Sequence, residues 1–374
     1  MRAAIITAAA AIFALALGGT AARAAPAEVI RTDHHVPVKS TAPGMAGGQA
    51  RLYVREVRLR GAAKPKGIVL FIHGAGTPAE VSFDVPYADY SWMAYLARAG
   101  FDVFAMDMEG YGRSTRPPPM ADACNAPAAA QAQFVPKTIP APCPASFKGP
   151  ITTMGSDWTD IGAVVDNLLA MRGQANLSIV AWSQGGPRSF GFALANPAKV
   201  ARIVALAPAY IVGMPTLAPD PLPPVAAPVT TQSEAEFKAN WDRQAPCPGQ
   251  YEPAAAASVW SEMMKSDPVG ATWGPGVRRA PSVPSWGFNK ETAPRMATPY
   301  LMVAGASDAQ VNPALVRQLY EDLGSKDKVL IDLACSSHNA MWEKNHLLLF
   351  KASADWLANG KVEGMSMGVV RMGY

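Results

Sequence analysis

The sequence Ala-Trp-Ser-Gln-Gly at residues 181–185 constrains the fold more than any other feature of this chain. An apolar run at 177–180, typical of a buried strand, comes before it, and a run typical of a helix follows at 186–195. A serine flanked by small residues at such a junction predicts a tight, strained turn that lifts the hydroxyl above the end of the sheet. We therefore predict that Ser183 is a nucleophile.

The same pentapeptide can also be an ordinary strand-to-helix turn, and Pro187 helps to decide between the two interpretations. Proline is tolerated in the first turn of a helix, where the backbone N–H groups have no partner within the helix. Its position therefore predicts a helix that begins at Ser183 or Gln184, as a nucleophile turn requires.

A serine hydroxyl needs a general base, and the base needs an acidic partner that orients it. An apolar run at 300–304 leads to Asp308, and a second run at 329–333 leads to His338. We predict that Asp308 is the acid and that His338 is the base. Two structural alternatives stay open, because Asp308 could cap a helix that starts near Pro313 and His338 could be an ordinary loop residue.

The group that stabilises negative charge is expected upstream of the serine. An apolar run at 67–72 leads into the loop His-Gly-Ala-Gly at 73–76, whose backbone N–H groups can stay free. Two amides directed at a developing oxyanion stabilise the transition state by several kcal/mol. We predict that the amides of Ala75 and Gln184 form this oxyanion hole, and that His73 has a structural role.

In these motifs and their order, the chain resembles the α/β-hydrolase superfamily, and in particular its serine esterases and lipases that carry a lid insertion. The resemblance implies an α/β fold with a mostly parallel sheet of about eight strands flanked by helices. It implies a core at 49–209 and 297–360, and a lid at 210–296 inserted between the sixth and seventh strands. The serine at 183 argues against haloalkane and epoxide hydrolases, which use a carboxylate at this position.

The lid segment contains several large aromatic and methionine side chains, which suit a hydrophobic substrate. Together with two residues near the nucleophile, they suggest a set of substrate-binding residues: Gly76, Trp182, Trp260 and Trp286. The alternative is that the aromatic residues form the hydrophobic core of the lid itself.

The two ends of the chain have compositions unlike the rest. Residues 1–24 have a charged start, a short apolar stretch and a small-residue cleavage site, which predict a signal peptide and a secreted or periplasmic protein. Residues 25–48 are expected to form an extended arm, and residues 361–374 form a tail without a recognisable pattern. No segment of the mature chain has the length of a membrane span.

The four cysteines of an exported chain favour disulfide bonds, although four cysteines allow three pairings. Cys124 and Cys143 lie in one proline-rich excursion, so we expect them to pair with each other. Cys247 and Cys335 would then join the lid to the histidine loop. Buried free thiols are the alternative.

These predictions together indicate an enzyme that hydrolyses carboxylic esters through an acyl-enzyme intermediate, with a small, hydrophobic ester as its partner. No cofactor or metal is expected, and a formal net charge of +4 without a basic cluster gives no indication of nucleic acid binding. The same triad can cleave C–C bonds, lactones or amides, or transfer an acyl group. A non-catalytic binding protein on this fold is the alternative from a different class, and the oligomeric state stays open.

Overall fold

The computed structural model describes residues 28–61 and 64–374, and a nine-stranded sheet forms its centre. The strands lie in the order β1-β2-β4-β3-β5-β6-β9-β10-β11, and the pairs β1–β2 and β2–β4 are antiparallel while the others are parallel. Their bounds are β1 (Val29–Lys39), β2 (Gln49–Leu59), β3 (Ile68–Ile72), β4 (Asp102–Met106), β5 (Leu177–Trp182), β6 (Val200–Leu206), β9 (Tyr300–Gly305), β10 (Lys328–Leu333) and β11 (Met367–Met372). The predicted α/β-hydrolase architecture is confirmed.

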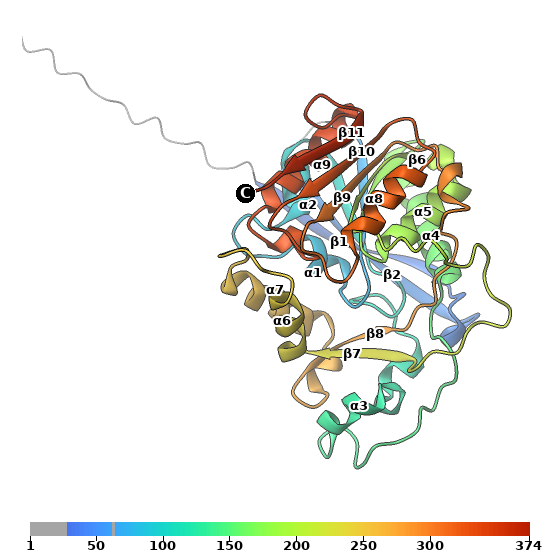
Figure 1. Ribbon diagram of the computed structural model, residues 1–374. Helices are drawn as coiled ribbons and strands as arrows, with labels where there is room; N and C mark the ends of the chain where they lie inside the picture. Colours follow the sequence, from blue (N-terminus) through green and yellow to red (C-terminus); the bar gives the residue numbers. More distant parts are fainter. Residues whose placement is uncertain (1–27, 62–63) are drawn as a thin grey trace, which may run out of the picture.

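Helices cover both faces of the sheet, as Figure 1 shows with the sheet between two groups of helices. On one side lie α1 (Ala79–Phe83), α2 (Trp92–Arg98) and α9 (His346–Asn359), of which α2 and α9 pack on each other. On the other side lie α4 (Met154–Arg172), α5 (Gly185–Ala195) and α8 (Pro313–Asp322), of which α4 and α5 pack on each other. This double cover explains why the central strands are apolar runs without alternation.

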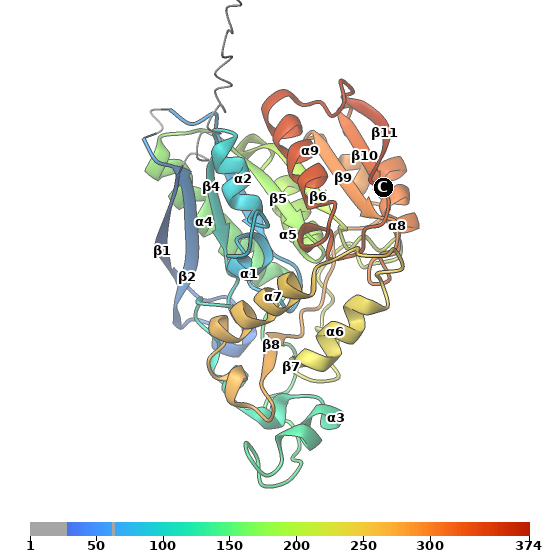
Figure 2. The same ribbon diagram turned by 90° about the vertical axis from the view of Figure 1, so that its left-hand side faces the viewer.

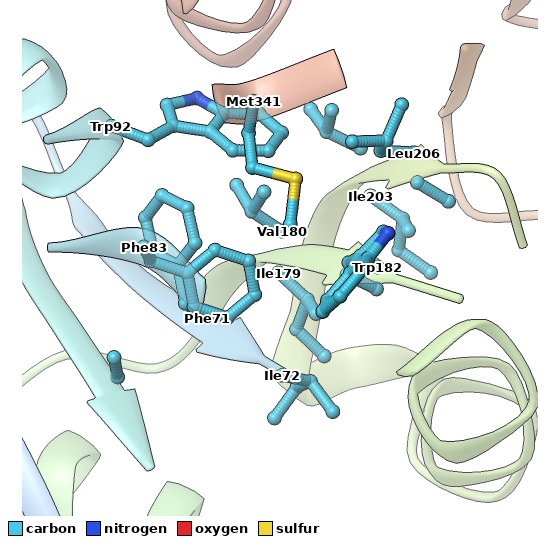
Figure 3. Close-up of a cluster of buried hydrophobic side chains, with 14 of the residues drawn as sticks. Phe71, Ile72, Phe83, Trp92, Ile179, Val180, Trp182, Ile203, Leu206 and Met341 are labelled. Carbon is cyan, nitrogen blue, oxygen red and sulfur yellow. The ribbon is translucent and has the colours of Figure 1, made fainter. Parts of the chain in front are cut away.

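The hydrophobic core lies directly beneath the end of β5. Every residue of β3 and β5 is buried. Figure 3 shows Phe71 of β3 beside Phe83 and Trp92, and Trp182 at the end of β5 beside this cluster. The ring centroids of Phe71 and Trp92 are 5.4 Å apart in an edge-to-face arrangement, which is favourable for aromatic pairs. The end of β5 is therefore fixed by close packing.

Two segments at the ends of the chain contribute more to the sheet than the sequence suggested. Of the extended arm expected at 25–48, the structure describes residues 28–48, and residues 29–39 pair along the whole of β2 and so belong to the sheet. A turn with a 3-10 helix at Pro43–Met45 joins the two strands, so this part of the expected arm is not extended. The tail at 361–374 contains β11, which pairs with β10. This added strand is one reason that the sheet has nine strands and not about eight. The predicted signal peptide at 1–24 lies outside the described residues.

The insertion after β6 lies across the carboxyl ends of the strands, at the bottom of Figure 2. It contains a two-stranded antiparallel ribbon, β7 (Val229–Ser233) and β8 (Val277–Pro281), and the helices α6 (Glu234–Asp242) and α7 (Pro253–Ser266). The proline-rich excursion, with the short α3 (Ala128–Gln131), packs against it through Phe134 and Trp273, whose ring centroids are 5.5 Å apart. Two insertions distant in sequence therefore form one cover over the sheet edge.

The cysteines form the two bonds expected from the sequence, Cys124–Cys143 and Cys247–Cys335. The first closes the excursion on itself, and the second joins the cover to the loop that carries His338. No free cysteine remains in the part of the chain that the structure describes. None of the helices formed by residues 28–61 and 64–374 has the length and apolar character needed to cross a membrane.

Candidate active site

Ser183 lies on a strained turn between β5 and α5. Its φ angle is +56°, in the left-handed region that residues other than glycine rarely adopt. The backbone N–H of Ser183 donates to the carbonyl of Leu206 at 3.0 Å, and Gly186 N–H donates to the Ser183 carbonyl at 2.8 Å. A Cβ atom at Gly185 would lie 2.3 Å from the carbonyl oxygen of Ile72. The turn therefore needs a small residue after Gln184, as the sequence pattern predicted.

Asp308 and His338 form a buried pair. The Nδ1–H group of His338 donates to Oδ2 of Asp308 at 2.8 Å, and the residues are 3% and 6% exposed. The other carboxylate oxygen of Asp308 accepts from the backbone amides of Gln310 and Val311, each at 2.8 Å. The carboxylate is thus fixed on both sides. The side chain of Asn312, and not Asp308, caps the start of α8.

The loops that carry the acid and the histidine are joined to each other. The amide and hydroxyl groups of Ser307 both donate to the carbonyl of Ser336, at 3.0 and 2.9 Å. A Cβ atom at Gly305 would lie 2.7 Å from the same carbonyl oxygen, so the close approach requires glycine. The indole N–H of Trp182 donates to the carbonyl of His338 at 2.8 Å, which fixes the histidine loop to the end of β5.

The histidine loop is also attached to the cover. The buried carboxylate of Glu343 accepts from the amide of Ser337 at 2.7 Å and from the indole N–H of Trp241, on α6, at 2.8 Å. Burial raises the pKa of Glu343, and these hydrogen bonds counteract the shift. The Cys247–Cys335 bond and a hydrogen bond from the Lys344 amide to the Gln250 carbonyl, at 2.9 Å, also attach the loop to the cover.

The loop at 73–76 runs beside the nucleophile. A Cβ atom at Gly74 would lie 2.8 Å from the Cβ atom of Ser183, so a larger residue would not fit. Within residues 28–61 and 64–374, the backbone amides of Ala75 and Gln184 donate to no other group. These are the two amides that the sequence predicted for an oxyanion hole, and both have an unused N–H group.

His73 is buried and acts within the loop. Its Nδ1–H group donates to the carbonyl of Gly74 at 2.7 Å, and its Nε2 accepts from the amide of Met108 at 3.1 Å. Only the neutral imidazole can make both bonds. Burial, together with the charge of Arg188, lowers the pKa of His73 well below its ordinary value.

Arg188 supports the same loop, and the sequence analysis missed it. Its guanidinium group is fully buried and donates to the carbonyls of His73 and Gly74 at 2.9 and 3.1 Å. A second nitrogen donates to the carboxylate of Asp157, on α4, at 2.7 Å. The available signal was a single charged side chain in an otherwise apolar helix at 185–195. An arginine at such a position needs a buried partner.

A cavity of about 140 Å³ opens over these residues. One side, the sheet wall, comprises Ala75, Gly76, Thr77, Trp182, Ser183, His338, Asn339 and Trp342, together with Gln310. The opposite side, the cover wall, comprises Thr230, Gln232, Phe237, Asn240 and Arg278.

Ser183 and His338 thus face one cavity, with Asp308 behind the histidine. The Ser183 hydroxyl donates to no residue in the described part of the chain, His338 included. The hydrogen bond between a nucleophile and its base is often long in a free enzyme and shortens when substrate binds.

The four residues predicted for substrate binding separate into two groups. Gly76 and Trp182 lie in the cavity wall. Trp260 packs within the cover against Phe237, at 5.8 Å between ring centroids, and is 8% exposed. Trp286 packs against Trp158 at 6.1 Å, and the structure does not bring either tryptophan to the cavity. Among the residues that the structure describes, no cluster of His, Cys, Asp or Glu side chains has the arrangement of a metal site.

Comparison with known proteins gives a family match for most of the chain and a set of solved structures with a similar fold. Residues 63–345, about three quarters of the chain, match the protein family described as serine aminopeptidase, S33. A search of curated proteins gives no match.

Several solved structures share the fold at low sequence identity. A serine hydrolase from the polyaromatic hydrocarbon-degrading bacterium Cycloclasticus zankles is 14% identical, with 89% of this chain and 100% of that chain covered and a TM-score of 0.50. A thermophilic esterase from Thermogutta terrifontis is 14% identical, with 87% of this chain and 98% of that chain covered and a TM-score of 0.50. The enol-lactonase from Burkholderia xenovorans is 17% identical, with 86% of this chain and 99% of that chain covered and a TM-score of 0.50.

Proposed function

Because this chain belongs to the serine aminopeptidase S33 family of α/β hydrolases, we propose that it is a serine hydrolase that cleaves carboxylic esters. The observation that supports the proposal most strongly is the buried Asp308–His338 pair, whose imidazole shares a cavity with Ser183. In this arrangement a carboxylate holds the histidine in the tautomer that can accept a proton from serine.

In the proposed first step, the hydroxyl oxygen of Ser183 attacks the ester carbonyl carbon while Nε2 of His338 takes the hydroxyl proton. The carboxylate of Asp308 stabilises the imidazolium that forms. The amides of Ala75 and Gln184 donate to the oxyanion of the tetrahedral intermediate. His338 then gives its proton to the leaving alcohol, and an acyl-enzyme remains.

In the second step, His338 removes a proton from water, and the resulting hydroxide attacks the acyl carbon. Collapse of the second tetrahedral intermediate expels Ser183, which recovers its proton from the imidazolium, and the carboxylic acid leaves. The chain's own residues supply every proton transfer in this sequence.

The charge of the cavity favours esters over peptides with a free amino terminus. An aminopeptidase must bind a substrate ammonium group, for which Asp or Glu is the usual partner. Among the described residues that line the cavity there is no Asp or Glu, and Arg278 is present. A positive side chain at this position opposes the binding of an ammonium group, because like charges repel.

The decisive experiment compares Ser183→Ala with Ser189→Ala, a control serine on α5 that lies outside the cavity. We expect Ser183→Ala to lose hydrolysis of short p-nitrophenyl esters by about 10⁵-fold or more and to lose labelling by a fluorophosphonate probe. Ser189→Ala should keep both. Undiminished turnover by a correctly folded Ser183→Ala protein would reject the proposal.

We also propose that the enzyme acts in the periplasm or outside the cell. The two disulfide bonds support this location, because such bonds persist in oxidising compartments. Sequencing of the amino terminus of the exported protein should find Ala25 as its first residue. A full-length chain retained in the cytoplasm would contradict this.

A further inference from the structure

Arg278, on β8, has a guanidinium group in the cavity wall that no acidic residue of the described chain neutralises. Its Nη1 donates to the hydroxyl of Thr77 at 2.8 Å, and among the described residues it forms no ion pair. The group lies against Gly76, where a Cβ atom would be 2.3 Å from Nη1. Gly76 has a φ angle of +78° and adjoins Ala75, whose free amide we assign to the oxyanion hole. The charge is therefore next to the place of reaction.

The neighbouring arginine shows how this chain neutralises a buried guanidinium elsewhere. Successive residues of a strand point to opposite faces, so Arg279 points away from the cavity. It donates to both carboxylate oxygens of Asp267, at 2.9 and 2.6 Å. Arg188 has its own carboxylate in Asp157. Arg278 differs from both, because its counter-charge is not supplied by the described protein.

An arginine in this setting remains charged. Burial lowers the pKa of Arg278 to about 10, which still leaves it protonated at neutral pH. Arg278 is half-buried, and even partial burial of a charge without an acidic partner costs free energy that a bound anion would offset. Oε1 of Gln232, directly opposite Arg278 in the ribbon, is also buried without a partner, but an amide oxygen accepts hydrogen bonds only, so it suits a donor group of the substrate and not its carboxylate.

We propose that Arg278 binds a carboxylate of the substrate, so that the preferred substrates are small esters with an anionic carboxylate near the scissile bond. The inference rests on the proposed function and adds its substrate class. Guanidinium and carboxylate groups match in shape and form two parallel hydrogen bonds. The cavity of about 140 Å³ is smaller than the roughly 300–1,000 Å³ of sites for drug-sized ligands, which limits the substrate to a short chain or one ring.

The test uses two pairs of esters whose members differ in charge and have similar size. Mono-p-nitrophenyl glutarate and p-nitrophenyl pentanoate vary the acyl side, and 4-acetoxybenzoate and its methyl ester vary the alcohol side. The rate with Ser183→Ala is subtracted as the background. We expect the wild type to favour the anionic member of at least one pair in kcat/KM.

The variants Arg278→Met, Arg278→Lys and Lys265→Met separate charge from general effects. Arg278→Met should lower the anionic-to-neutral ratio of kcat/KM by about 10- to 100-fold, mainly through KM, because a charged hydrogen bond is lost. Arg278→Lys should keep part of the ratio, since it keeps the charge but not the planar fork. Lys265→Met removes a charge from an exposed site on α7 and should leave the ratio unchanged.

The possible failures are distinguishable. Equal loss on both members of each pair in Arg278→Met would assign Arg278 to the positioning of the loop at 73–77, and would overturn the inference. A wild-type preference for the neutral members would also overturn it. In both cases Ser183-dependent turnover leaves the proposed function intact. Absence of any turnover and of fluorophosphonate labelling would reject the proposed function, and this inference with it.

Discussion

The two walls of the cavity differ in how their polar groups are held. On the sheet wall, His338 is fixed by Asp308 and by the indole of Trp182, and each carboxylate oxygen of Asp308 has a partner. On the cover wall, Arg278 has one neutral hydrogen bond and Gln232 has a buried oxygen without a partner. The Asp308–His338 pair is therefore satisfied within the protein, while the guanidinium group of Arg278 keeps donors that a ligand can use.

This difference follows from where each wall comes from. The sheet wall is built at the ends of strands that have a fixed register and a buried core, part of which Figure 3 shows beside Trp182. On the cover wall, Thr230, Gln232 and Arg278 belong to the ribbon of β7 and β8, which pairs with no other strand of the described chain, and Phe237 and Asn240 belong to α6. The comparison suggests that the sheet carries the reaction and that the insertion selects the substrate.

The largest effect is expected from a change at Asp308 that keeps the shape of the sheet wall. In Asp308→Asn, Oδ1 can still accept from the amides of Gln310 and Val311, but an NH₂ group then faces Nδ1 of His338. The imidazole would adopt the tautomer that cannot accept the serine proton. We expect kcat for p-nitrophenyl esters to fall by about 10⁴-fold with little change in KM.

Asn312→Ala is the control for this change, because Asn312 caps α8 only four residues away. It should cost about 1 kcal/mol of stability and leave kcat unchanged. If Asp308→Asn kept its kcat, the sheet wall would not be the place of reaction. The assignment of the reaction to the sheet wall and of substrate selection to the cover wall would then be wrong.

The candidate catalytic residues beside the sheet wall could be predicted from the sequence, because Ser183, Asp308 and His338 each follow a strand-like run. The runs before Ser183, Asp308 and His338 are buried strands of a parallel sheet, whose ends meet at one edge. Side-chain hydrogen bonds between distant segments left no such periodic signal. The support of the loop at 73–76 by Arg188 therefore emerged only from the structure.

The cover wall could not be predicted, because the register of an insertion depends on packing that has no sequence period. The tryptophans at 260 and 286 were reasonable candidates on composition, yet they pack within the protein. Arg278 and Arg279 are adjacent, and the sequence alone does not say which of them faces a cavity. Strand alternation predicts opposite faces only once β8 is known.

An effect of intermediate size is expected on the free energy of unfolding when the arginines on the two faces of the ribbon are replaced in turn. In Arg279→Met, Arg116, at 3.7 Å, is the one cationic partner that the described residues leave to the buried carboxylate of Asp267. Burial alone would raise the pKa of Asp267, but Arg279 and Arg116 keep it below its ordinary value. We expect Arg279→Met to lower the free energy of unfolding by about 3–5 kcal/mol, as breaking a buried pair does.

Arg278→Met is the matched comparison, because it removes the same side chain one residue away without leaving an acid unpaired. Urea unfolding should show a loss of less than about 1 kcal/mol for this variant, or a gain. Equal destabilisation by both variants would contradict the view that Arg279 stabilises the folded protein and that Arg278 instead binds a ligand.

The smallest effect tests whether the sheet wall depends on a neutral His73. The folded-state pKa of His73 lies well below its value in the unfolded chain, so the unfolded chain binds the extra proton first. The stability that the neutral imidazole contributes is complete above about pH 6.5 and is lost as the pH falls below it, by at most about 1.4 kcal/mol per pH unit.

The variant His73→Asn lacks this titration, although it loses the hydrogen bond from Met108 at every pH. The difference in unfolding free energy between wild type and His73→Asn, measured in urea, should therefore shrink between pH 7.5 and pH 5.5. A difference that stays constant over this range would mean that His73 takes up a proton without cost in the folded state, and that the loop at 73–76 does not depend on its neutral form.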